Sequence, residues 1–514
     1  MLAMQLPEAC SEPAVKKTKI LAGKLFDPYS LDFLENRLIT VSEKSGLIVD
    51  VQPFDHLTGI VLSRQPDVVD LRKQTVLPGF VDAHVHFFLH PYSEVTWEDQ
   101  VTRENLTERT VRAVVHAKRT LMAGYTAVRD LGTEGAEDAD ITLRKCLSGP
   151  NPMVPGPRYF TANRAIVTTG SYGPKNRLYP NRDGVEGVTG AEVADGESEC
   201  RRAVRRQVGA GADWIKVIVS LRQRSFITNG RITQDLRRCV FRYRCVPRAV
   251  YAADYRARAR IADADPITAG RSFPTFTESE LEAVVSEAHR LGVKVAAHAS
   301  TSSSWTTLHA INHRVDTIEH AYEIGELFDE TTRPRLSVDP PLRSKGTAVW
   351  VPTLATYYTV GQTSGVWEKA AKTFKTVLAH TDPKDLAIAC GGDTGVFAHG
   401  DNALEMKVMV RLGADWRLVL RWATLGGWQC LRSMRWEGEE GLDRLNRVEE
   451  LGEDARVVGD NEVPFGAVRK GFAADIIATN GDFAKDFEGA VDKASISFVM
   501  KGAAVCKLDG RELV

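Results

Sequence analysis

The chain has 514 residues, with 66 Lys and Arg against 67 Asp and Glu, and 43% of its residues are hydrophobic. This length and composition are typical of a globular protein with a large core and a side domain, and the net charge of −1 gives no reason to expect binding to nucleic acid or to a membrane. No apolar run could span a bilayer, the N-terminus lacks the pattern of a cleaved secretory signal, and none of the eight cysteines forms a CxxC pair. We therefore expect a cytoplasmic protein with reduced thiols.

Both ends of the chain have the pattern of short strands separated by turns. Apolar or alternating runs are broken there by Gly, Pro, Asn and Asp. We therefore predict one small β-sandwich domain built from residues 1–77 and 465–514. The runs are Ile20–Lys24, Arg37–Val41, Leu47–Val51, Ala474–Ala478, Ile496–Met500 and Ala503–Lys507.

The middle of the chain, residues 78–464, alternates apolar strand-like runs with helical patterns. Thr277-Glu278-Ser279-Glu280 has the form of a capping box, and a second helical period covers Thr110–Ala123. Strands alternating with helices predict a parallel sheet, and eight of them predict a (β/α)₈ TIM barrel; no GxGxxG follows the first strand, which weakens the open-sheet alternative. The eight runs are Val76–His86, Tyr125–Leu131, Arg158–Val167, Trp214–Ser220, Val293–Ala299, Thr317–Tyr322, Ala348–Ala355 and Leu386–Gly392.

One stretch, residues 221–271, does not fit this alternation. It holds twelve Arg and four Asp, with no Lys and no Glu, and it has no clean helical or strand period. A basic arm for nucleic acid is one interpretation, although such arms usually mix Lys with Arg. We favour an atypical insertion into a strand-to-helix loop of the barrel, such as a translated intron or a mispredicted exon. We expect it to lie outside the working barrel.

The first predicted barrel strand ends in two histidines, His84 and His86. Residues i and i+2 of a strand point to the same face, so the two imidazoles project together. Neutral imidazoles on one face are good ligands for a divalent transition metal. Alone, this HxH pattern is a weak signal, because two packed or exposed histidines are the commoner situation.

The same kind of residue recurs at the ends of the other predicted strands. Lys216 lies inside an apolar run, where a buried ammonium is costly unless it is paired, modified or able to reach the barrel rim. His298, His320 and Asp393 end three further runs. Because active sites of such barrels lie at the C-terminal strand ends, this set is difficult to explain by packing alone.

This pattern resembles the metal-dependent amidohydrolase superfamily over about residues 17–220 and 272–514. The opening Leu77-Pro78-Gly79-Phe80-Val81-Asp82-Ala83-His84-Val85-His86 is similar to that family's first-strand signature, and residues 466–475 resemble its return into the β domain. Within the superfamily, Thr168–Pro174 and Thr424–Trp428 are similar to the branch of prolidase-like peptidases and fungal ochratoxinase-like amidases.

The resemblance implies a site with two divalent metal ions, which we expect to be zinc. Superfamily members without a lysine at the position of Lys216 typically hold one metal, so this residue argues against a mononuclear deaminase. Carboxylation of the lysine by CO₂ would also convert a costly buried cation into an anionic ligand with two oxygens. In the implied arrangement His84, His86 and Asp393 hold the first metal, His298 and His320 hold the second, and carboxylated Lys216 bridges them.

The implied activity is hydrolysis of an amide bond of an N-acyl amino acid or a dipeptide-like substrate. Two metals would clamp a bridging hydroxide, and Asp393 would take its proton and pass it to the leaving nitrogen. The alternatives are a prolidase-type Xaa-Pro dipeptidase and a catalytically impaired relative used as an assembly protein. The Gly170-Ser171-Tyr172-Gly173 loop replaces the Gly-Gly-His-Gly of bacterial prolidase-like relatives, which argues against plain prolyl-dipeptide specificity.

Two tyrosines are candidates for contact with substrate, namely Tyr172 and Tyr357, although packing at the rim is the alternative for each. The residues after the first strand could wall an apolar pocket or could instead seal their loop onto the barrel; they are Phe87, Phe88, His90 and Trp97. As partners we expect a small-molecule amide or dipeptide substrate and a second copy of the chain in a homo-oligomer, with no nucleic acid and no membrane.

Overall fold

The computed structural model describes residues 16–149, 151–173, 190–221, 273–300, 304–328, 348–381, 387–450 and 461–514. The Arg-rich stretch predicted to be an insertion lies, apart from Leu221, outside these residues. Within the described part, no helix is long and apolar enough to cross a membrane.

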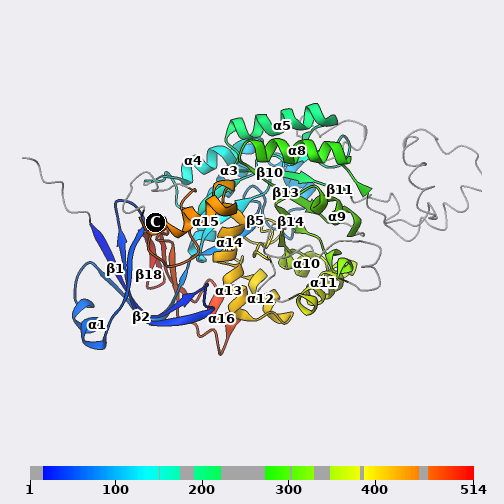
Figure 1. The fold of residues 1–514 in the computed structure, drawn as a ribbon. Helices are drawn as coiled ribbons and strands as arrows, with labels where there is room; N and C mark the ends of the chain where they lie inside the picture. The colour runs from blue at the N-terminus through cyan, green and yellow to red at the C-terminus, as the bar shows by residue number, and fades with distance from the viewer. Residues whose placement is uncertain are drawn as a thin grey trace, which may run out of the picture.

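Strands from both ends of the chain form one sheet of eight strands, in the order β19-β18-β17-β16-β4-β1-β2-β3. The two ends meet where β16 pairs antiparallel with β4, which itself pairs parallel with β1. Figure 1 shows β1, β2 and β18 of this sheet at one end of the molecule. The strands predicted at both ends are thereby confirmed, whereas their arrangement as a sandwich stays a prediction. The strands are β1 Lys17–Asp27, β2 Asp32–Ser42, β3 Ile48–Pro53, β4 Val68–Pro78, β16 Ile476–Thr479, β17 Ile496–Lys501, β18 Ala504–Leu508 and β19 Arg511–Glu512.

The middle of the chain is an α/β fold with two parallel sheets, in the orders β5-β6-β7 and β15-β14-β13-β10-β8-β9. Isolated bridges connect Thr394 with Val85 of the first sheet and Ile388 with Trp350 of the second. The segment 387–394 therefore lies between an edge strand of each sheet. The strands are β5 Phe80–Val85, β6 Tyr125–Asp130, β7 Arg158–Thr161, β8 Ile166–Val167, β9 Glu192–Val193, β10 Trp214–Ile218, β13 Lys294–Ala299, β14 Thr317–His320 and β15 Val349–Val351, with an antiparallel pair β11 Ser220–Leu221 and β12 Phe273–Pro274.

The predicted run Val76–His86 is divided between two sheets, which corrects the sequence-based expectation. Its first part is the end of β4, and β5 begins only at Phe80. Gly79 separates them at a close approach, because a Cβ atom there would lie 2.0 Å from Oγ1 of Thr126. A continuous apolar run does not reveal that its two halves pair with different partners.

The predicted run Arg158–Val167 is likewise divided, into β7 and β8 of different sheets. Two other strand predictions are too long. The run Ala348–Ala355 is a strand only to Val351, and Leu354 begins helix α10 (Leu354–Val360). In the predicted run Leu386–Gly392, the described residues 387–392 make an isolated bridge instead of a named strand. Short apolar runs do not distinguish a strand from a helix start or a loop, and tertiary contacts decide between them.

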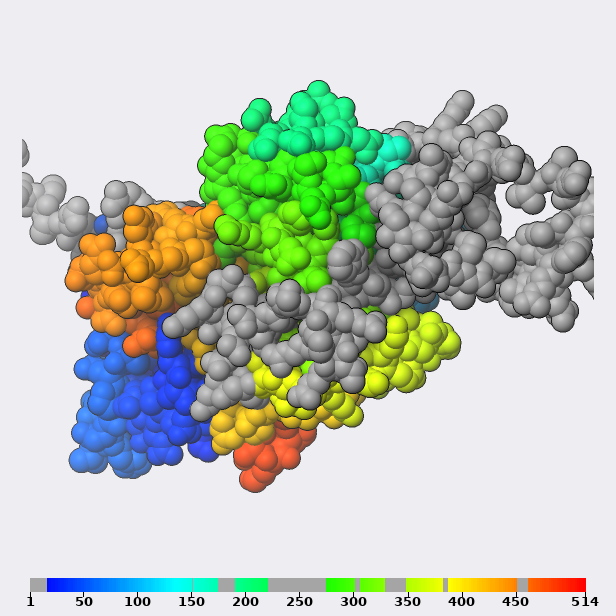
Figure 2. Space-filling view, turned by 45° about the vertical axis from the view of Figure 1, so that its right-hand side comes forward, coloured from blue at the N-terminus to red at the C-terminus, as the bar shows by residue number. Residues whose placement is uncertain are grey.

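The predicted capping box begins helix α8 (Glu278–Arg290), where Thr277 Oγ1 accepts from the Glu280 amide and Glu280 accepts from the Thr277 amide. The helix predicted over Thr110–Ala123 is α3 (Leu106–Met122), and it begins earlier because Asn105 supplies its N-cap. α5 (Gly196–Ala210) and α8 lie side by side over the parallel strands (Figure 1). In the space-filling view they form the teal and green surface at the top of the molecule (Figure 2). The other helices are α1 His56–Leu62, α2 Trp97–Arg103, α4 Ala139–Leu147, α5 Gly196–Ala210, α9 Ser304–Asn312, α11 Val366–His380, α12 Leu404–Arg411, α13 Trp416–Trp422, α14 Leu425–Leu431, α15 Gly438–Asn446 and α16 Phe487–Val491.

Candidate metal centre

A cavity of about 130 Å³ lies at the C-terminal ends of the parallel strands, and it gathers the residues that the sequence singled out. All six predicted metal ligands line it, as does Tyr172. The described lining residues are His84, His86, Leu89, Tyr92, Leu131, Glu134, Ala165, Tyr172, Lys216, Ile218, His298, His320 and Asp393.

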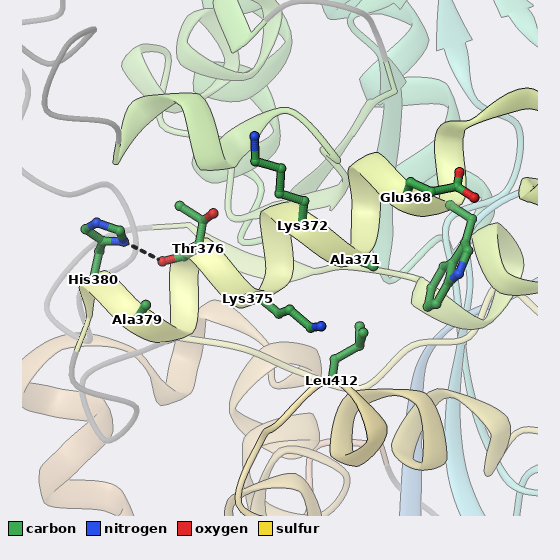
Figure 3. Close-up of a pocket in the computed structure, with 9 residues that line it drawn as sticks. Glu368, Ala371, Lys372, Lys375, Thr376, Ala379, His380 and Leu412 are labelled. Carbon is green, nitrogen blue, oxygen red and sulfur yellow. Dashed lines mark hydrogen bonds between the residues drawn. The ribbon is translucent and has the colours of Figure 1, made fainter.

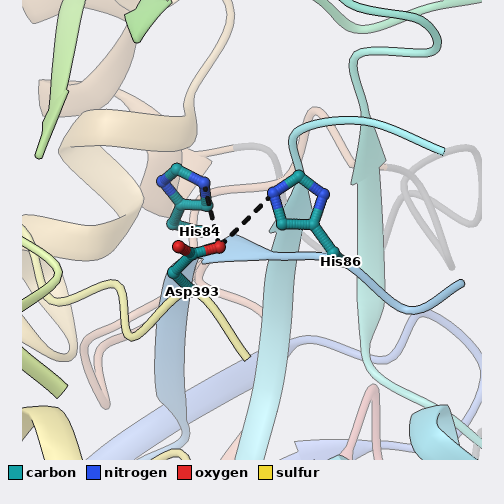
Figure 4. Close-up of side chains that lie close together, drawn as sticks. All are labelled: His84, His86 and Asp393. Atoms are coloured by element: carbon teal, nitrogen blue, oxygen red, sulfur yellow. Dashed lines mark ion pairs between the residues drawn. The ribbon is translucent and has the colours of Figure 1, made fainter. Parts of the chain in front are cut away.

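His84 and His86 face the carboxylate of Asp393. Their Nε2 atoms lie 3.5 Å and 3.4 Å from Oδ1 of Asp393, and all three residues are buried. Figure 4 shows both imidazoles turned toward this carboxylate. Two imidazole nitrogens and a carboxylate oxygen this close together are a typical set of ligands for a divalent transition metal.

Hydrogen bonds on the far side of each ring fix both imidazoles. Nδ1 of His84 donates to Oε2 of Glu319 at 2.8 Å, and Nδ1 of His86 donates to the carbonyl of Gly132 at 2.8 Å. With Nδ1 protonated, the lone pair of each neutral ring is on Nε2, which faces Asp393. Histidine ligands of metals are usually oriented in this way.

Glu319 is itself held by the buried side chain of Arg129. Nη2 of Arg129 donates to Oε1 of Glu319 at 2.8 Å, while Nε donates to the carbonyl of Ala83 at 2.8 Å. Neither side chain of the ion pair is exposed, and the Arg129 guanidinium lies 4.3 Å from the centre of the Trp214 ring. Because both charges are fully hydrogen-bonded, this pair is a rigid support for His84.

Sequence reasoning missed Arg129 and Glu319. Both are charged residues inside apolar strand runs, which is the same signal that drew attention to Lys216. Applied to every strand, that signal would have identified them as a buried pair.

His298 and His320 form a second group of imidazoles beside the first. Their ring centres are 4.4 Å apart, and the ring of His320 is 5.0 Å from that of His84. Burial lowers the pKa of His298 to about 3 and that of His320 well below its ordinary value, and the positive charge of Lys216 adds to both shifts. Both rings are therefore neutral and able to bind a cation through a nitrogen.

Two of these residues have an unusual backbone conformation. His320 has φ 69° and Asp393 has φ 62°, in the left-handed region that side chains other than Gly rarely adopt. His320 follows Glu319, whose side chain points toward His84, and a regular strand would send the next side chain to the opposite face. The left-handed turn instead allows both consecutive side chains to reach the site, a kind of strain that often marks functional residues.

Lys216 is buried in β10 with only 3% of its surface exposed, and its Nζ has no hydrogen-bond partner among the described residues. Burial lowers its pKa to about 8, against the raising effect of Glu319. A buried amine without a partner is costly, and it lies in the same cavity as four imidazoles and a carboxylate. The chemistry of these residues fits a divalent metal site.

The two candidate substrate-binding tyrosines lie in different places. Tyr172 lines the cavity, and its hydroxyl donates to Oε2 of Glu134 at 2.6 Å. Tyr357 is in α10, behind His320 at 6.2 Å between ring centres, and is not among the residues that line the cavity. Of the residues after β5, Phe87, Phe88 and His90 are buried and seal their loop, whereas Trp97 contacts Glu134.

A second hollow of about 650 Å³ lies on the exposed face of α11 (Figure 3). Its side chains, among them Glu368, Lys372, Lys375 and His380, point in different directions. Among the described residues, three metal-ligating groups lie close together at His84, His86 and Asp393, whereas no such group is found in the hollow on α11. We therefore place the candidate chemistry in the smaller, buried cavity.

Comparison with known proteins agrees with this assignment. Residues 75–229 match the amidohydrolase family. Over these residues the chain is similar to members of that family. An ochratoxinase from Aspergillus niger is 24% identical over 522 aligned residues, covering 97% of this chain and 88% of that protein.

Two solved structures have the same fold as this chain. A Xaa-Pro dipeptidase with bound methionine has a TM-score of 0.66 at 24% identity, covering 96% of this chain and 100% of that one. The A. niger ochratoxinase structure has a TM-score of 0.66 at 19% identity, covering 96% and 97%. The family and the ochratoxinase relative support a hydrolase that acts on carbon–nitrogen bonds.

Proposed function

We propose that this protein is a metal-dependent hydrolase that cleaves the amide bond of an N-acyl amino acid or a dipeptide-like substrate. The observation that carries the proposal is the unpartnered Nζ of Lys216, buried in one cavity with four histidines and Asp393. A lysine placed in this way is stable when it is carboxylated and bound to metal, and it is otherwise a costly buried amine.

In this proposal His84, His86 and Asp393 would hold one divalent cation, and His298 and His320 would hold another. Lys216, if carboxylated, would supply an anionic ligand to the same site. Imidazole and oxygen ligands without a thiolate favour zinc. When bound, such cations supply Lewis acidity toward the scissile carbonyl and lower the pKa of water.

Asp393 is the residue that moves protons in this mechanism. Burial raises the pKa of its carboxyl, while His86 and Lys216 act in the opposite direction. A raised pKa suits a carboxylate that must accept a proton from water and then give it to the leaving nitrogen. Glu319 and Arg129 contribute by keeping the Nε2 atom of His84 directed at the site.

The proposal includes the predicted architecture, with a (β/α)₈ barrel over residues 78–464 and a β-sandwich domain from residues 1–77 and 465–514. The parallel ladders of β5 to β7 and of β8 to β15, together with the bridges made by Ile388 and Thr394, support a closed arrangement. The strand pairing of β16 with β4 supports a domain made from both ends. Homo-oligomerisation and a cytoplasmic location stay predictions from the sequence.

A screen with metal-loaded protein tests the proposal. N-acetyl amino acids, glycyl amino acids and Xaa-Pro dipeptides should be incubated with protein produced with zinc and bicarbonate, and release of the free amino acid should be measured. We expect hydrolysis that chelation abolishes and that added zinc restores. Metal-loaded protein that cleaves none of these amides would contradict the proposal and favour the assembly-protein alternative.

A further inference from the structure

The wall of the cavity carries a carboxylate that the proposed mechanism does not use. Apart from the six candidate ligands, the described lining residues are apolar or tyrosines, except for Glu134. Glu134 follows β6, and only 6% of its surface is exposed. A carboxylate on the wall of a small, largely apolar cavity has a strong effect on which ligands fit there.

Two side chains fix the carboxylate of Glu134 through hydrogen bonds. Nε1 of Trp97 donates to its Oε2 at 3.0 Å, and the hydroxyl of Tyr172 donates to the same oxygen at 2.6 Å. The other oxygen, Oε1, lies close to Gly132, where a built Cβ atom would be 3.4 Å from Oε1 and 3.6 Å from Cε1 of His86. One oxygen is therefore anchored, and the carboxylate shares its cavity with the candidate metal ligands.

The backbone of Glu134 is also held in place. Nη2 of the buried Arg109 donates to the carbonyl oxygens of Thr133 and Glu134, at 3.0 Å and 2.9 Å. Glu134 has φ 50°, a conformation that costs energy for a residue other than Gly and that persists where surrounding contacts enforce it. These contacts hold a negative charge in one position next to the reacting centre.

A fixed carboxylate here selects for a cationic group close to the scissile bond. In an unprotected dipeptide, the α-ammonium is attached to the carbon next to the scissile carbonyl, so it must lie near the metal ligands when that carbonyl does. An N-acyl amino acid has no such group, and it would leave the carboxylate desolvated without a partner. The charge of Glu134 interacts with Lys216, one of the six candidate ligands, and with Arg109, which donates to the backbone carbonyl of Glu134; the other described lining residues include no Lys or Arg.

We propose that Glu134 is a specificity-determining residue that binds the α-ammonium group of the substrate, so that the substrate class is unprotected dipeptides and related α-aminoacyl amides. This inference rests on the proposed function, and of the two substrate types proposed there it selects the dipeptide-like substrates over the N-acyl amino acids. Trp97 and Tyr172 act as positioning residues for the carboxylate.

A pair of ligands that differ only in the ammonium group tests this binding directly. Glycine hydroxamic acid and acetohydroxamic acid carry the same metal-binding group, and their affinities can be measured by calorimetry on full-length, zinc-loaded protein. We expect wild type to bind glycine hydroxamic acid about ten- to a hundred-fold more tightly, as for a charge-assisted hydrogen bond. Glu134→Gln should remove this preference and leave the affinity for acetohydroxamic acid unchanged. Gln keeps an acceptor for Trp97 and Tyr172, so the fold should be retained.

Glu137→Gln is the matched control, because Glu137 lies three residues further along, also has a positive φ, and pairs with Arg164 near the surface. A second arm compares hydrolysis of glycyl-L-phenylalanine with that of N-acetyl-L-phenylalanine, which share the scissile bond. Glu134→Gln should lower kcat/KM for the dipeptide about ten-fold or more and leave that of the acetyl compound within about three-fold.

The outcomes separate this inference from the proposed function. The role of Glu134 is overturned if wild type binds both hydroxamic acids equally, or if Glu134→Gln keeps the preference for glycine hydroxamic acid. In either case, hydrolysis of one of the amides would leave the proposed function intact. An equal loss on both amides also overturns the role of Glu134, since it would indicate a catalytic or structural role. If zinc-loaded wild type binds neither hydroxamic acid and cleaves neither amide, the proposed function is wrong, and this inference is wrong with it.

Discussion

The two sides of the cavity are built in different ways. On one side the ligands lie at the ends of strands, and buried contacts such as Arg129–Glu319–His84 hold them. On the other side Tyr172 and Glu134 lie in loops, held by side chains from α2 and α3. The difference indicates that the sheet determines the chemistry, whereas the loops determine the substrate, as is common for sites at strand ends.

The largest effect should come from Asp393, on the strand-end side. Asp393→Asn keeps the size of the side chain but cannot accept a proton, so we expect kcat to fall about 10³-fold or more with the fold retained. Circular dichroism and turnover of the best amide substrate measure this. Asp401→Asn is the control, because Asp401 pairs with Lys493 at the surface. Turnover within a few-fold of wild type would remove Asp393 from the proton transfer.

Glu319 should have the next largest effect, through metal affinity. Glu319→Gln weakens the hydrogen bond to His84 and leaves the Arg129 guanidinium without its counter-charge. We expect metal affinity to fall about 10- to 100-fold, as for other residues that orient a metal ligand. Competition with a chelator measures it. Unchanged affinity in a folded variant would show that the support of His84 is not needed.

On the loop side, Tyr172→Phe should have a modest and selective effect. It removes one of the two hydrogen bonds to Oε2 of Glu134, which is worth about 1 kcal/mol, or about five-fold. The preference for glycine hydroxamic acid should fall by that factor while acetohydroxamic acid binds as before. Tyr358→Phe is the control, since Tyr358 packs against Trp367 away from the cavity. A loss of affinity for both ligands would indicate that Tyr172 shapes the cavity in general.

Glu323 should affect stability rather than catalysis. It is buried four residues after Glu319, and burial raises the pKa of its carboxyl to about 8, although a hydrogen bond with Tyr322 acts in the opposite direction. The carboxyl of Glu323 keeps its proton in the folded protein at pH values where the unfolded chain, with the ordinary pKa of 4.5, has lost it. The protonated carboxyl therefore contributes its full stability below pH 4.5, and this stability is lost as the pH rises through the folded-state pKa of about 8.

Glu323→Gln should therefore raise Tm at about pH 8, by the equivalent of about 1–3 kcal/mol, and should change it little at about pH 5. Thermal unfolding followed by circular dichroism at several pH values measures this. Glu326→Gln, at an exposed position in the same region, should show no such trend. A Tm difference that does not vary with pH would contradict the assigned protonation.

Replacement of the Arg-rich stretch should have the smallest effect. Leu221 and Phe273 are directly opposite each other in the antiparallel pair β11–β12, so an Asn-Gly turn can join them in place of residues 222–272. We predict that the shortened protein folds and binds metal at least as well as the full chain. If it unfolds or loses metal that the full chain retains, the stretch is a structural element and the prediction of a dispensable insertion is wrong.

Much of the strand-end side could be predicted from the sequence. The strand period places His84 and His86 on one face, and an apolar run around Lys216 implies that its amine is buried. The positive φ angles that bring His320 and Asp393 into the site could not be predicted, since they depend on contacts of the folded chain. Only their position at the ends of apolar runs pointed to them.

The loop side was largely hidden from sequence reasoning. Glu134 has no periodic pattern around it, and its partners Trp97 and Tyr172 are 37 and 38 residues away in the chain. The division of Val76–His86 between two sheets was hidden for a similar reason, because pairing partners lie far apart in sequence. Chemistry placed by local strand geometry is predictable, whereas contacts between distant loops are not.

The metal content of the purified protein tests the central claim most directly. Elemental analysis of wild type produced with zinc and bicarbonate should give about two metals per chain, and Lys216→Met should lower this to about one or less, because the shared ligand is lost. Both proteins should be folded by circular dichroism. A reproducible wild-type value near one, or a Lys216→Met value that stays near two, would contradict a centre with two metals bridged by this lysine.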